Sequence, residues 1–412
     1  MATAHKEIKI TDDMVIADEP IAKFVKLGFG LGVAGLAVAV GLGAAKGDHW
    51  LNFLHSYLTS YAYFLSIGLG ALFFVVLQHL TRSGWSVTVR RLVEYFMSAF
   101  PLLAVLSLPI IGSAVAGFHL YEWVDPAIVA KDALIQHKEP FLNLNFFLVR
   151  CAIYFTVWLT ISTIMFKRSK AQDESGDPAI SSGLEKMAPV SMVLFALTMT
   201  FAAVDFIMSL DPHWFSTIIG VYFFAGCFLS CLSTLVLVAM GLQKAGKLEG
   251  LITEEHYHDI GKFMFAFTFF WGYIAFSQFM LYWYADIPEE TGWYLVRQSS
   301  TWVGWALLLL FTHFIIPFPG LLSRHVKRNK FGLKFWAIWI LGAHYVDMYY
   351  LIMPSLTSVH KVEGFPLSFM DLACFVGIGG LLVGFVASKM RGQRLVPIKD
   401  PRLSECLAHE NV

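Results

Sequence analysis

Charged residues are scarce in this sequence, and they form no long basic run. Lysine, arginine, aspartate and glutamate make up 15% of the 412 residues, hydrophobic residues make up 57%, and the formal net charge is zero. Soluble domains carry about 25% charged residues, so this composition excludes an ordinary soluble protein. The lack of a basic patch excludes nucleic acid as a partner. A mean hydropathy of +0.62 is typical of a polytopic membrane protein.

Cysteine is also sparse and lacks the spacings that bind cofactors. The five cysteines are Cys151, Cys227, Cys231, Cys374 and Cys406, with no C-x-x-C, C-x-x-C-H or ferredoxin-like pattern among them. Covalently attached haem and iron–sulfur clusters need such patterns. We therefore expect no covalent cofactor, no metal ligands and no redox centre on this chain.

A cleavable signal is missing as well. Residues 1–23 mix Lys6 and Lys9 with acidic residues such as Asp12, Asp13, Asp18 and Glu19, unlike the basic segment that precedes the short apolar core of a signal peptide. The first apolar run is long enough to cross a membrane, so we expect it to be retained. Residues 1–23 are then a cytoplasmic N-terminal segment.

Long apolar runs fill most of the remaining chain. Between Lys262 and Asp286 no residue carries a full charge, and this run can cross a bilayer core of about 30 Å. It is apolar around its whole circumference, as a helix among lipids and other helices must be. In all, ten runs predict an all-α integral membrane protein with ten transmembrane helices: 24–45, 50–79, 92–118, 144–166, 187–210, 214–242, 262–284, 298–320, 334–353 and 367–389.

The distribution of positive charge orients these ten spans. With a cytoplasmic N-terminus, the inner segments hold 24 of the 30 lysines and arginines and the outer loops hold 5, while Arg150 lies inside a span. Such an excess on one side follows the positive-inside rule. We therefore expect a multi-pass protein with both termini in the cytoplasm, a ten-helix domain over 24–389 and a cytoplasmic tail over 390–412.

Spans four apart share short motifs. Phe64-Leu65-Ser66 in the second span matches Phe228-Leu229-Ser230 in the sixth, and Leu148-Val149-Arg150 matches Leu295-Val296-Arg297. Further matches join the third span to the seventh and the fifth to the ninth, in order and in the same orientation. These matches predict a parallel repeat of two four-helix bundles, 50–210 (spans 2–5) and 214–353 (spans 6–9), flanked by spans 1 and 10.

Ionisable residues inside spans are costly, so each is a functional candidate. Arg150 and Asp205 lie at similar depths on neighbouring antiparallel spans, which allows them to pair as a structural salt bridge or as a carboxylate tuned for proton exchange. Arg297 and Asp347 are their equivalents in the second bundle. His344 lies one turn from Asp347 and adds a titratable neighbour.

The other polar residues of the spans form an inner and an outer tier. The inner tier, His79, Glu94 and His313, extends the list of proton-pathway candidates. Glu94 and His79 lie near helix ends, where they can also simply reach water. A lone intramembrane histidine such as His313 is more often a hydrogen-bonded packing residue than a proton carrier. The outer tier comprises His55, His119, Glu122 and Asp371.

Three segments resemble one known family. They are HKEPFLNLNFFLVRCAIYFTVW (137–158), SLDPHWFSTIIGVYFFAG (209–226) and HYHDIGKFMFAFTFFWGYIAFSQFMLYWYADIPEET (256–291). These are similar to the F subunit of bacterial alternative complex III, a quinol:electron-acceptor oxidoreductase, and to the wider NrfD/PsrC-like membrane proteins. Asp286 departs from the pattern, because relatives more often carry asparagine there, at the water-exposed rim.

This resemblance implies a function within a complex of the bacterial inner membrane. The expected partners are a sister NrfD-like C subunit, an iron–sulfur B subunit, multi-haem c subunits, small membrane subunits and lipid. Haems c and iron–sulfur clusters lie on those partners, while the F subunit is a second quinone-binding subunit suspected of moving protons. The resemblance transfers no quinone ligands to particular residues. The candidates for a quinone site are therefore the residues of the outer tier: His55, His119, Glu122 and Asp371.

The leading hypothesis is therefore a non-redox membrane subunit of a quinol-oxidising complex that binds or flanks menaquinol and conducts protons. Quinol oxidation releases protons, which requires a base near the outer face of the complex. Asp205 with Arg150 is the first choice, and Asp347 with His344 the second. One alternative is a secondary transporter. Transporters usually bind substrate at helices broken near the membrane midplane, whereas the prolines of this chain fall mostly in the end thirds of its spans. The other is a b-haem cytochrome, for which His79 and His313 are the best-matched axial pair.

Overall fold

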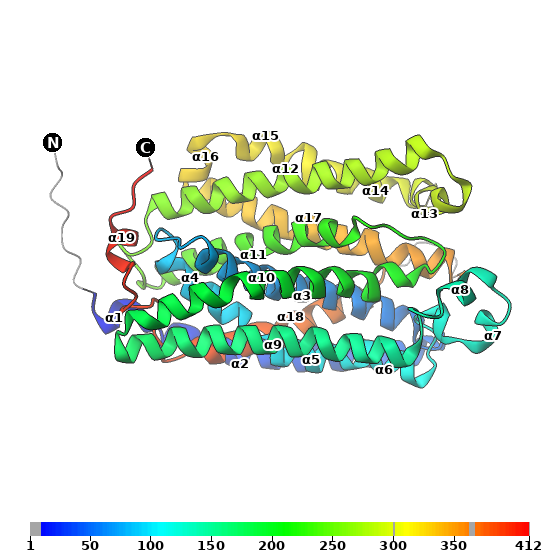
Figure 1. Cartoon of the computed structure of the whole chain (residues 1–412), viewed down its shortest axis with the longest axis horizontal. Helices are drawn as coiled ribbons and strands as arrows, with labels where there is room; N and C mark the ends of the chain where they lie inside the picture. The colour runs from blue at the N-terminus through cyan, green and yellow to red at the C-terminus, as the bar shows by residue number, and fades with distance from the viewer. Residues whose placement is uncertain (1–9, 300, 362–366, 412) are drawn as a thin grey trace.

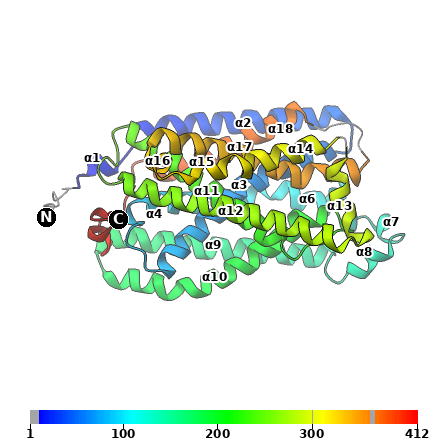
Figure 2. The same ribbon diagram turned by 90° about the horizontal axis from the view of Figure 1, so that it is seen from above.

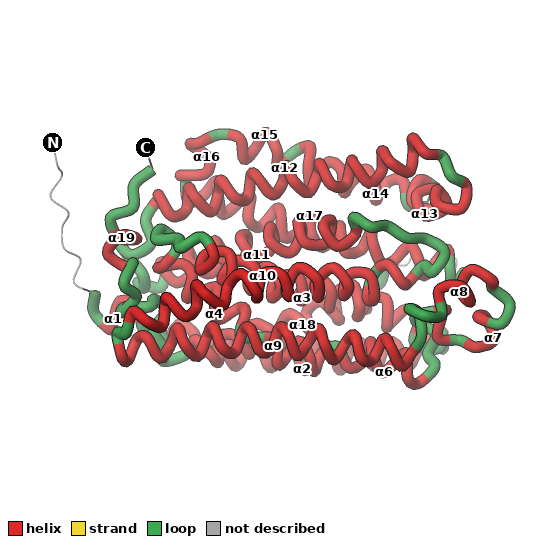
Figure 3. Tube along the Cα trace, viewed as in Figure 1, coloured by secondary structure: helices red, strands yellow, loops and turns green. Residues whose placement is uncertain are grey.

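Helices account for almost all of the ordered structure. The computed structural model describes residues 10–299, 301–361 and 367–411, so part of the expected N-terminal segment, residues 1–9, lies outside the described residues. Within them there is no β-strand, only a single isolated bridge between Ile16 and Arg394. Figure 3 shows a bundle of long helices joined by short loops. The predicted all-α class is confirmed.

The helices in chain order are α1 (Asp12–Val15), α2 (Glu19–Lys46), α3 (Leu51–Leu80), α4 (Val87–Met97), α5 (Phe100–Leu106), α6 (Leu108–Ala116), η1 (Glu122–Val124), α7 (Pro126–Val129), α8 (Ala133–Lys138), α9 (Leu144–Ser175), α10 (Pro178–Phe206), η2 (Met208–Leu210), α11 (Ile219–Lys244), α12 (Glu254–Ala285), α13 (Pro288–Gln298), α14 (Val303–Leu309), η3 (Leu310–Ile315), α15 (Pro317–Leu322), α16 (Arg324–Arg328), α17 (Lys330–Ser358), α18 (Phe369–Met390) and α19 (Leu403–Leu407).

Nine helical segments of the described chain are long and apolar enough to cross a membrane. They are α2, α3, α4–α6, α9, α10 with η2, α11, α12, α14–α15 and α18, and each contains most of one predicted run. The predicted run 334–353 lies in α17, whose 29 residues would extend about 43 Å. Its lysines, His344 and Asp347 make it less apolar, so the tenth span stays a prediction. The chain is a multi-pass α-helical membrane protein.

Prolines explain where two of these segments change geometry. Pro101 and Pro109 stand in the first turns of α5 and α6, where a missing N–H costs least, so the third segment is built from three consecutive helices. In the eighth segment Pro317 cannot donate to the carbonyl of His313, four residues earlier. There the chain widens into the π-helix η3, in which the Ile316 amide donates to the Phe311 carbonyl at 3.0 Å.

Helices α3 and α11 form the centre of the molecule. In their most apolar stretches 89% and 78% of residues are buried, against 22% in α2. Helix α3 packs against α10, α11, α17 and α18, so the two predicted bundles would share a broad interface. Helices α2 and α18 pack together at the periphery (Figure 2). Their backbones nearly touch, since a Cβ on Gly28 would lie 2.5 Å from the Gly384 nitrogen.

Both termini lie at one end of the bundle, which we call the termini end (Figure 1). Residues 117–143, with η1, α7 and α8, lie at the opposite end together with α13. Residues 167–186, between the predicted fourth and fifth spans, are mostly helical. Helix α9 runs to Ser175, Gly176 adopts the left-handed conformation with φ of +69°, and the Asp177 side chain caps α10.

Candidate functional site

A buried carboxylate on α17 is the centre of the candidate site. Asp347 is fully buried, and its Oδ1 accepts a hydrogen bond of 2.5 Å from the Tyr222 hydroxyl of α11. Its Oδ2 accepts from the Trp271 indole of α12 at 3.1 Å. Both donors are neutral groups. Within the described residues no lysine or arginine forms an ion pair with Asp347, so its negative charge has no fixed counter-ion.

The repeat predicted that Arg297 pairs with Asp347, by analogy with Arg150 and Asp205. In the structure Arg297 does not pair with Asp347. Its Nε and Nη2 donate instead to the carbonyls of Tyr350 and Leu351, at 3.1 and 2.9 Å. Pro354 explains this choice, because it lies inside α17 and has no N–H to donate to the Tyr350 carbonyl. The guanidinium supplies the missing donor, so this part of the sequence-based prediction is wrong.

The Nδ1 atom of His344 faces Asp347 and carries no hydrogen. The Ser66 hydroxyl donates its only hydrogen to the Tyr63 carbonyl at 2.6 Å, so the Ser66 oxygen must accept from Nε2–H of His344 at 2.8 Å. Nδ1 of this neutral ring then carries a lone pair. It has no hydrogen-bond partner among the described residues and lies 3.9 Å from Asp347 Oδ2.

His313 completes the group from the π-helix η3. Its side chain is 1% exposed, and its ring centroid lies 3.9 Å from that of Trp271. Neither ring nitrogen has a hydrogen-bond partner in the described structure, which is unusual for a buried histidine. One donor atom from each of His313, His344 and Asp347 lies within 4.8 Å of the others. We call these three residues the Asp347 cluster.

The chemistry of the Asp347 cluster favours a bound cation. Three unpartnered imidazole nitrogens and a carboxylate without a counter-ion gather in a low-dielectric interior. An isolated buried charge is far too costly to persist, so a carboxylate there is neutralised or paired. A proton shared by the cluster would do this. Two imidazoles and a carboxylate also form a donor set suited to a first-row transition metal.

Arg150 and Asp205 do form the pair that their equal depths predicted. Arg150 Nε and Nη2 donate to the two carboxylate oxygens of Asp205 at 2.8 and 2.7 Å, and the Tyr154 hydroxyl adds a third bond at 2.6 Å. The rings of Phe141 and Phe146 lie over the guanidinium. This carboxylate is fully paired, as expected of a structural salt bridge.

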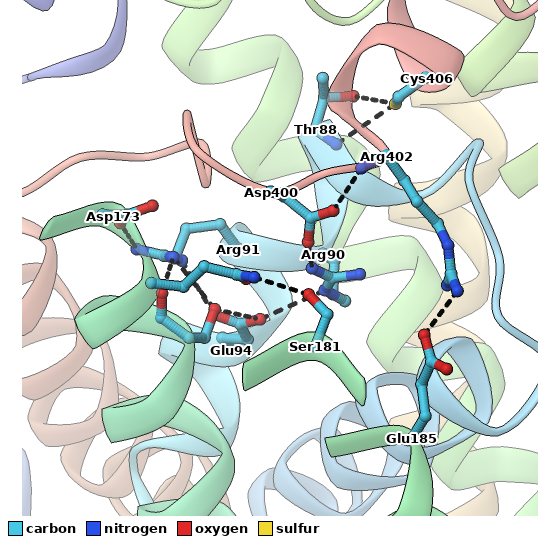
Figure 4. Close-up of polar contacts among 12 residues, drawn as sticks. Thr88, Arg90, Arg91, Glu94, Asp173, Ser181, Glu185, Asp400, Arg402 and Cys406 are labelled. Carbon is cyan, nitrogen blue, oxygen red and sulfur yellow. Dashed lines mark hydrogen bonds and ion pairs between the residues drawn. The ribbon is translucent and has the colours of Figure 1, made fainter. Parts of the chain in front are cut away.

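His79 and Glu94, which the sequence suggested could reach water, are buried instead. They are 4% and 0% exposed at the termini end. Glu94 accepts a hydrogen bond from Arg90 and forms an ion pair with Arg91 at 2.8 Å. Asp400 of the C-terminal tail lies 2.5 Å from Arg90 (Figure 4). The tail folds back over these helix ends, which a reading of separate spans does not anticipate.

Asp173 and Ser169 of α9 complete this inner network. Arg91 donates to Asp173 at 2.7 Å and to Ser169, whose hydroxyl in turn donates to Glu94. Arg402 of the tail pairs with Glu185 nearby (Figure 4). The network joins four separate chain segments, and its carboxylates are paired with guanidinium groups. It differs in this respect from the Asp347 cluster.

The four quinone-site candidates lie on separate elements of the structure. His55 bonds to the Leu51 carbonyl at 2.8 Å and lies 3.2 Å from the Ser355 hydroxyl, whereas Asp371 caps the first turn of α18. His119 is half exposed beside Asp125. Glu122 begins η1, and partial burial raises the pKa of its carboxyl. None of the four lines the cavities of about 640 and 10 Å³ that the described residues form.

Sequence reasoning missed three residues that surround the Asp347 cluster. Tyr222, Trp271 and Ser66 each bond to it, and each comes from a different helix. Ser66 is part of the motif repeated between spans, but nothing in that motif indicates a histidine partner. Aromatic residues are ordinary packing material in membrane helices, so Tyr222 and Trp271 carry no distinguishing signal.

Comparisons with known proteins add no assignment. A scan against models of protein families finds no match for this chain, and a search of curated proteins finds none either. The sequence and structure establish a multi-pass α-helical membrane protein. Between α11, α12, η3 and α17 it holds a buried carboxylate that has no lysine or arginine partner among the described residues.

Proposed function

We propose that the chain is a non-redox membrane subunit of a bacterial quinol-oxidising complex and exchanges protons at the Asp347 cluster. The resemblance of residues 137–158, 209–226 and 256–291 to the F subunit of alternative complex III supports membership of such a complex. Membership implies menaquinol nearby and haem and iron–sulfur subunits as partners. The absence of a counter-ion for Asp347 is the single observation that carries the proton assignment.

The hydrogen-bond pattern supports a proton in the cluster. Asp347 Oδ2 and His344 Nδ1 face each other at 3.9 Å, and both would present lone pairs if neither were protonated. One proton on either atom removes this repulsion and neutralises the carboxylate. The pair can therefore hold and release a proton with small movements of two side chains. His313, with both ring nitrogens unpartnered, is the next acceptor within the cluster.

The geometry favours Asp347 over Asp205, which reverses the order expected from the sequence. Protonating Asp205 would break two bonds to Arg150 and leave a buried guanidinium without a partner. Protonating Asp347 strands no cation. We therefore assign the proton-exchanging role to the second half of the chain and a structural role to Arg150 and Asp205.

Replacing Asp347 tests this assignment. The complex, reconstituted in liposomes with quinol and its electron acceptor, is followed by acceptor reduction and by a pH-sensitive dye. Asp347→Asn is expected to slow coupled proton movement by about 10²-fold, the range of a lost acid–base group. Asp205→Asn serves as the matched control and should lower stability while keeping the number of protons moved per electron unchanged.

Two results would overturn the assignment. One is wild-type proton movement in Asp347→Asn. The other is one zinc or iron per chain by elemental analysis, lost in His313→Ala, since a resident metal would then neutralise the cluster in place of a proton. Membership of the complex is tested separately by co-purification with a multi-haem c protein and an iron–sulfur protein.

A further inference from the structure

A cavity lies at the termini end, far along the helices from the Asp347 cluster. Its volume is about 640 Å³, within the range of small-molecule sites. The C-terminal end of α11, the loop that follows it and the N-terminal ends of α12 and α17 form its walls. Helices α12 and α17 begin at this end (Figures 1 and 2). The cavity is therefore at the boundary between membrane and water.

Three lysines line this cavity. Lys244 is the last residue of α11, and Lys330 and Lys334 stand one turn apart on α17. Within the described chain, Lys244 and Lys334 form no ion pair or hydrogen bond, and Lys330 donates only to the Gln243 side chain at 3.0 Å. Two helix N-termini add partial positive charge. The three lysines thus favour the binding of an anion in this cavity.

Two carboxylates also line the cavity. Glu249 belongs to the loop between α11 and α12, and Glu254 is the first residue of α12. Both are exposed, and neither forms a salt bridge with a described residue. Lys334 lies about 6 Å deeper along α17 than Lys330. The deepest of these charges is therefore the Lys334 ammonium, one turn inside α17, whereas Glu249 lies in the loop outside the helices.

An apolar track leads from the lysines into the membrane. Phe331, Phe335 and Ile338 follow one another on one face of α17, with exposed fractions of 81%, 46% and 55%. Phe331 itself lines the cavity. A ligand with a charged head and a hydrocarbon chain could occupy the cavity and the track at once.

We infer that this cavity binds the headgroup of a phospholipid of the phosphatidylethanolamine type. The phosphodiester anion contacts Lys244, Lys330 and Lys334, and the terminal ammonium reaches Glu249 and Glu254. In such a lipid the phosphate lies deeper than the ammonium, which matches the order of charges along the cavity. The acyl chains follow Phe335 and Ile338. This site is independent of quinol oxidation.

Native mass spectrometry of the purified complex tests the inference. Delipidated protein is incubated with phosphatidylethanolamine or phosphatidylglycerol, and bound lipid per complex is counted. Lys244→Gln with Lys334→Gln should lower the affinity for phosphatidylethanolamine about tenfold. Lys23→Gln with Lys26→Gln, two exposed lysines on α2 near the same end, is the matched control and should leave binding unchanged.

The carboxylates give a second, independent readout. Glu249→Gln with Glu254→Gln should remove the preference for phosphatidylethanolamine over phosphatidylglycerol without lowering total lipid binding. Equal binding in the lysine variant and its control would overturn the inference. So would displacement of the lipid by millimolar inorganic phosphate, which would indicate an anion site without a lipid track. All four substituted positions are exposed, so folding is not at risk.

Discussion

The repeat predicted from the sequence matches Arg150 and Asp205 with Arg297 and Asp347, and only the first two form an ion pair. Arg150 binds Asp205 through two bonds, while Arg297 turns to the Tyr350 carbonyl. The difference arises from Pro354, which leaves that carbonyl without its helical donor. One backbone position thus frees a carboxylate 7 residues away for another role.

Gly226 on α11 keeps room for the Asp347 cluster. A Cβ at this position would lie 2.7 Å from His344 Cε1 and 3.0 Å from Nδ1, so Gly226→Ala should displace the imidazole. We expect proton movement in this variant to fall about as far as in His344→Gln. Gly241→Ala on the same helix meets no atom within 4 Å and is the control. Equal activity of the two glycine variants would contradict the proposed geometry.

Arg150 and Asp205 should behave as a coupled buried pair. Arg150→Gln leaves a buried carboxylate uncompensated, and we expect a loss of about 3–5 kcal/mol in stability. The double variant Arg150→Gln with Asp205→Asn should recover much of this loss, because no unpaired charge remains. Thermal unfolding in detergent measures both. Additive losses in the double variant would show that the two side chains do not interact.

At the scale of elements, the contact between α2 and α18 depends on missing side chains. A Cβ on Gly380 would lie 2.6 Å from the Gly32 nitrogen, and backbone atoms cannot move aside as side chains do. Gly380→Val should therefore separate α2 from the bundle and expose the connection at residues 47–50 to protease. Gly30→Val, which meets nothing within 4 Å, should leave cleavage unchanged.

The C-terminal tail is a second element, and Cys406 can report on how it is held. The Cys406 thiol donates to the Trp85 carbonyl at 2.9 Å, and burial raises its pKa. A raised pKa leaves little reactive thiolate at pH 8, so alkylation should be slow. Asp400→Asn removes the partner of Arg90 and should speed alkylation at least about tenfold, a shift of 1.4 kcal/mol in tail opening.

The control for this measurement is Arg391→Gln. Arg391 lies at the start of the tail and pairs with the exposed Asp18. It should leave the alkylation rate of Cys406 unchanged. The other four cysteines are buried inside spans and should not react on the same timescale. If Asp400→Asn and the wild type react equally fast, the buried ion network does not hold the tail.

At the scale of the whole molecule, the termini share one end of the bundle, and the distribution of charge predicts that this end is cytoplasmic. Reporter fusions after Val412 and after residue 46 should therefore give opposite results, cytoplasmic for the first and external for the second. The same orientation places the proposed lipid site in the inner leaflet. A periplasmic signal from the C-terminal fusion would reverse every inner and outer assignment.

Much of this architecture could be predicted from residues close together in the chain. Apolar runs such as 262–284 specify membrane helices because each helix satisfies its own backbone hydrogen bonds. Equal depth on consecutive antiparallel spans was enough to pair Arg150 with Asp205. The same argument failed for Arg297, because Pro354 leaves the Tyr350 carbonyl without a donor and Arg297 bonds to it. The depth of a residue in the membrane does not predict such a contact.

What the sequence alone determined was the class of protein, the approximate spans and a short list of costly polar residues. Only the tertiary structure decided which of these residues meet. It brought His313 beside His344 and Asp347 through a π-turn, and it covered Glu94 with the tail. Helix formation is local, whereas the pairing of buried charges depends on contacts between segments far apart in the chain, and one sequence read span by span does not contain those distances.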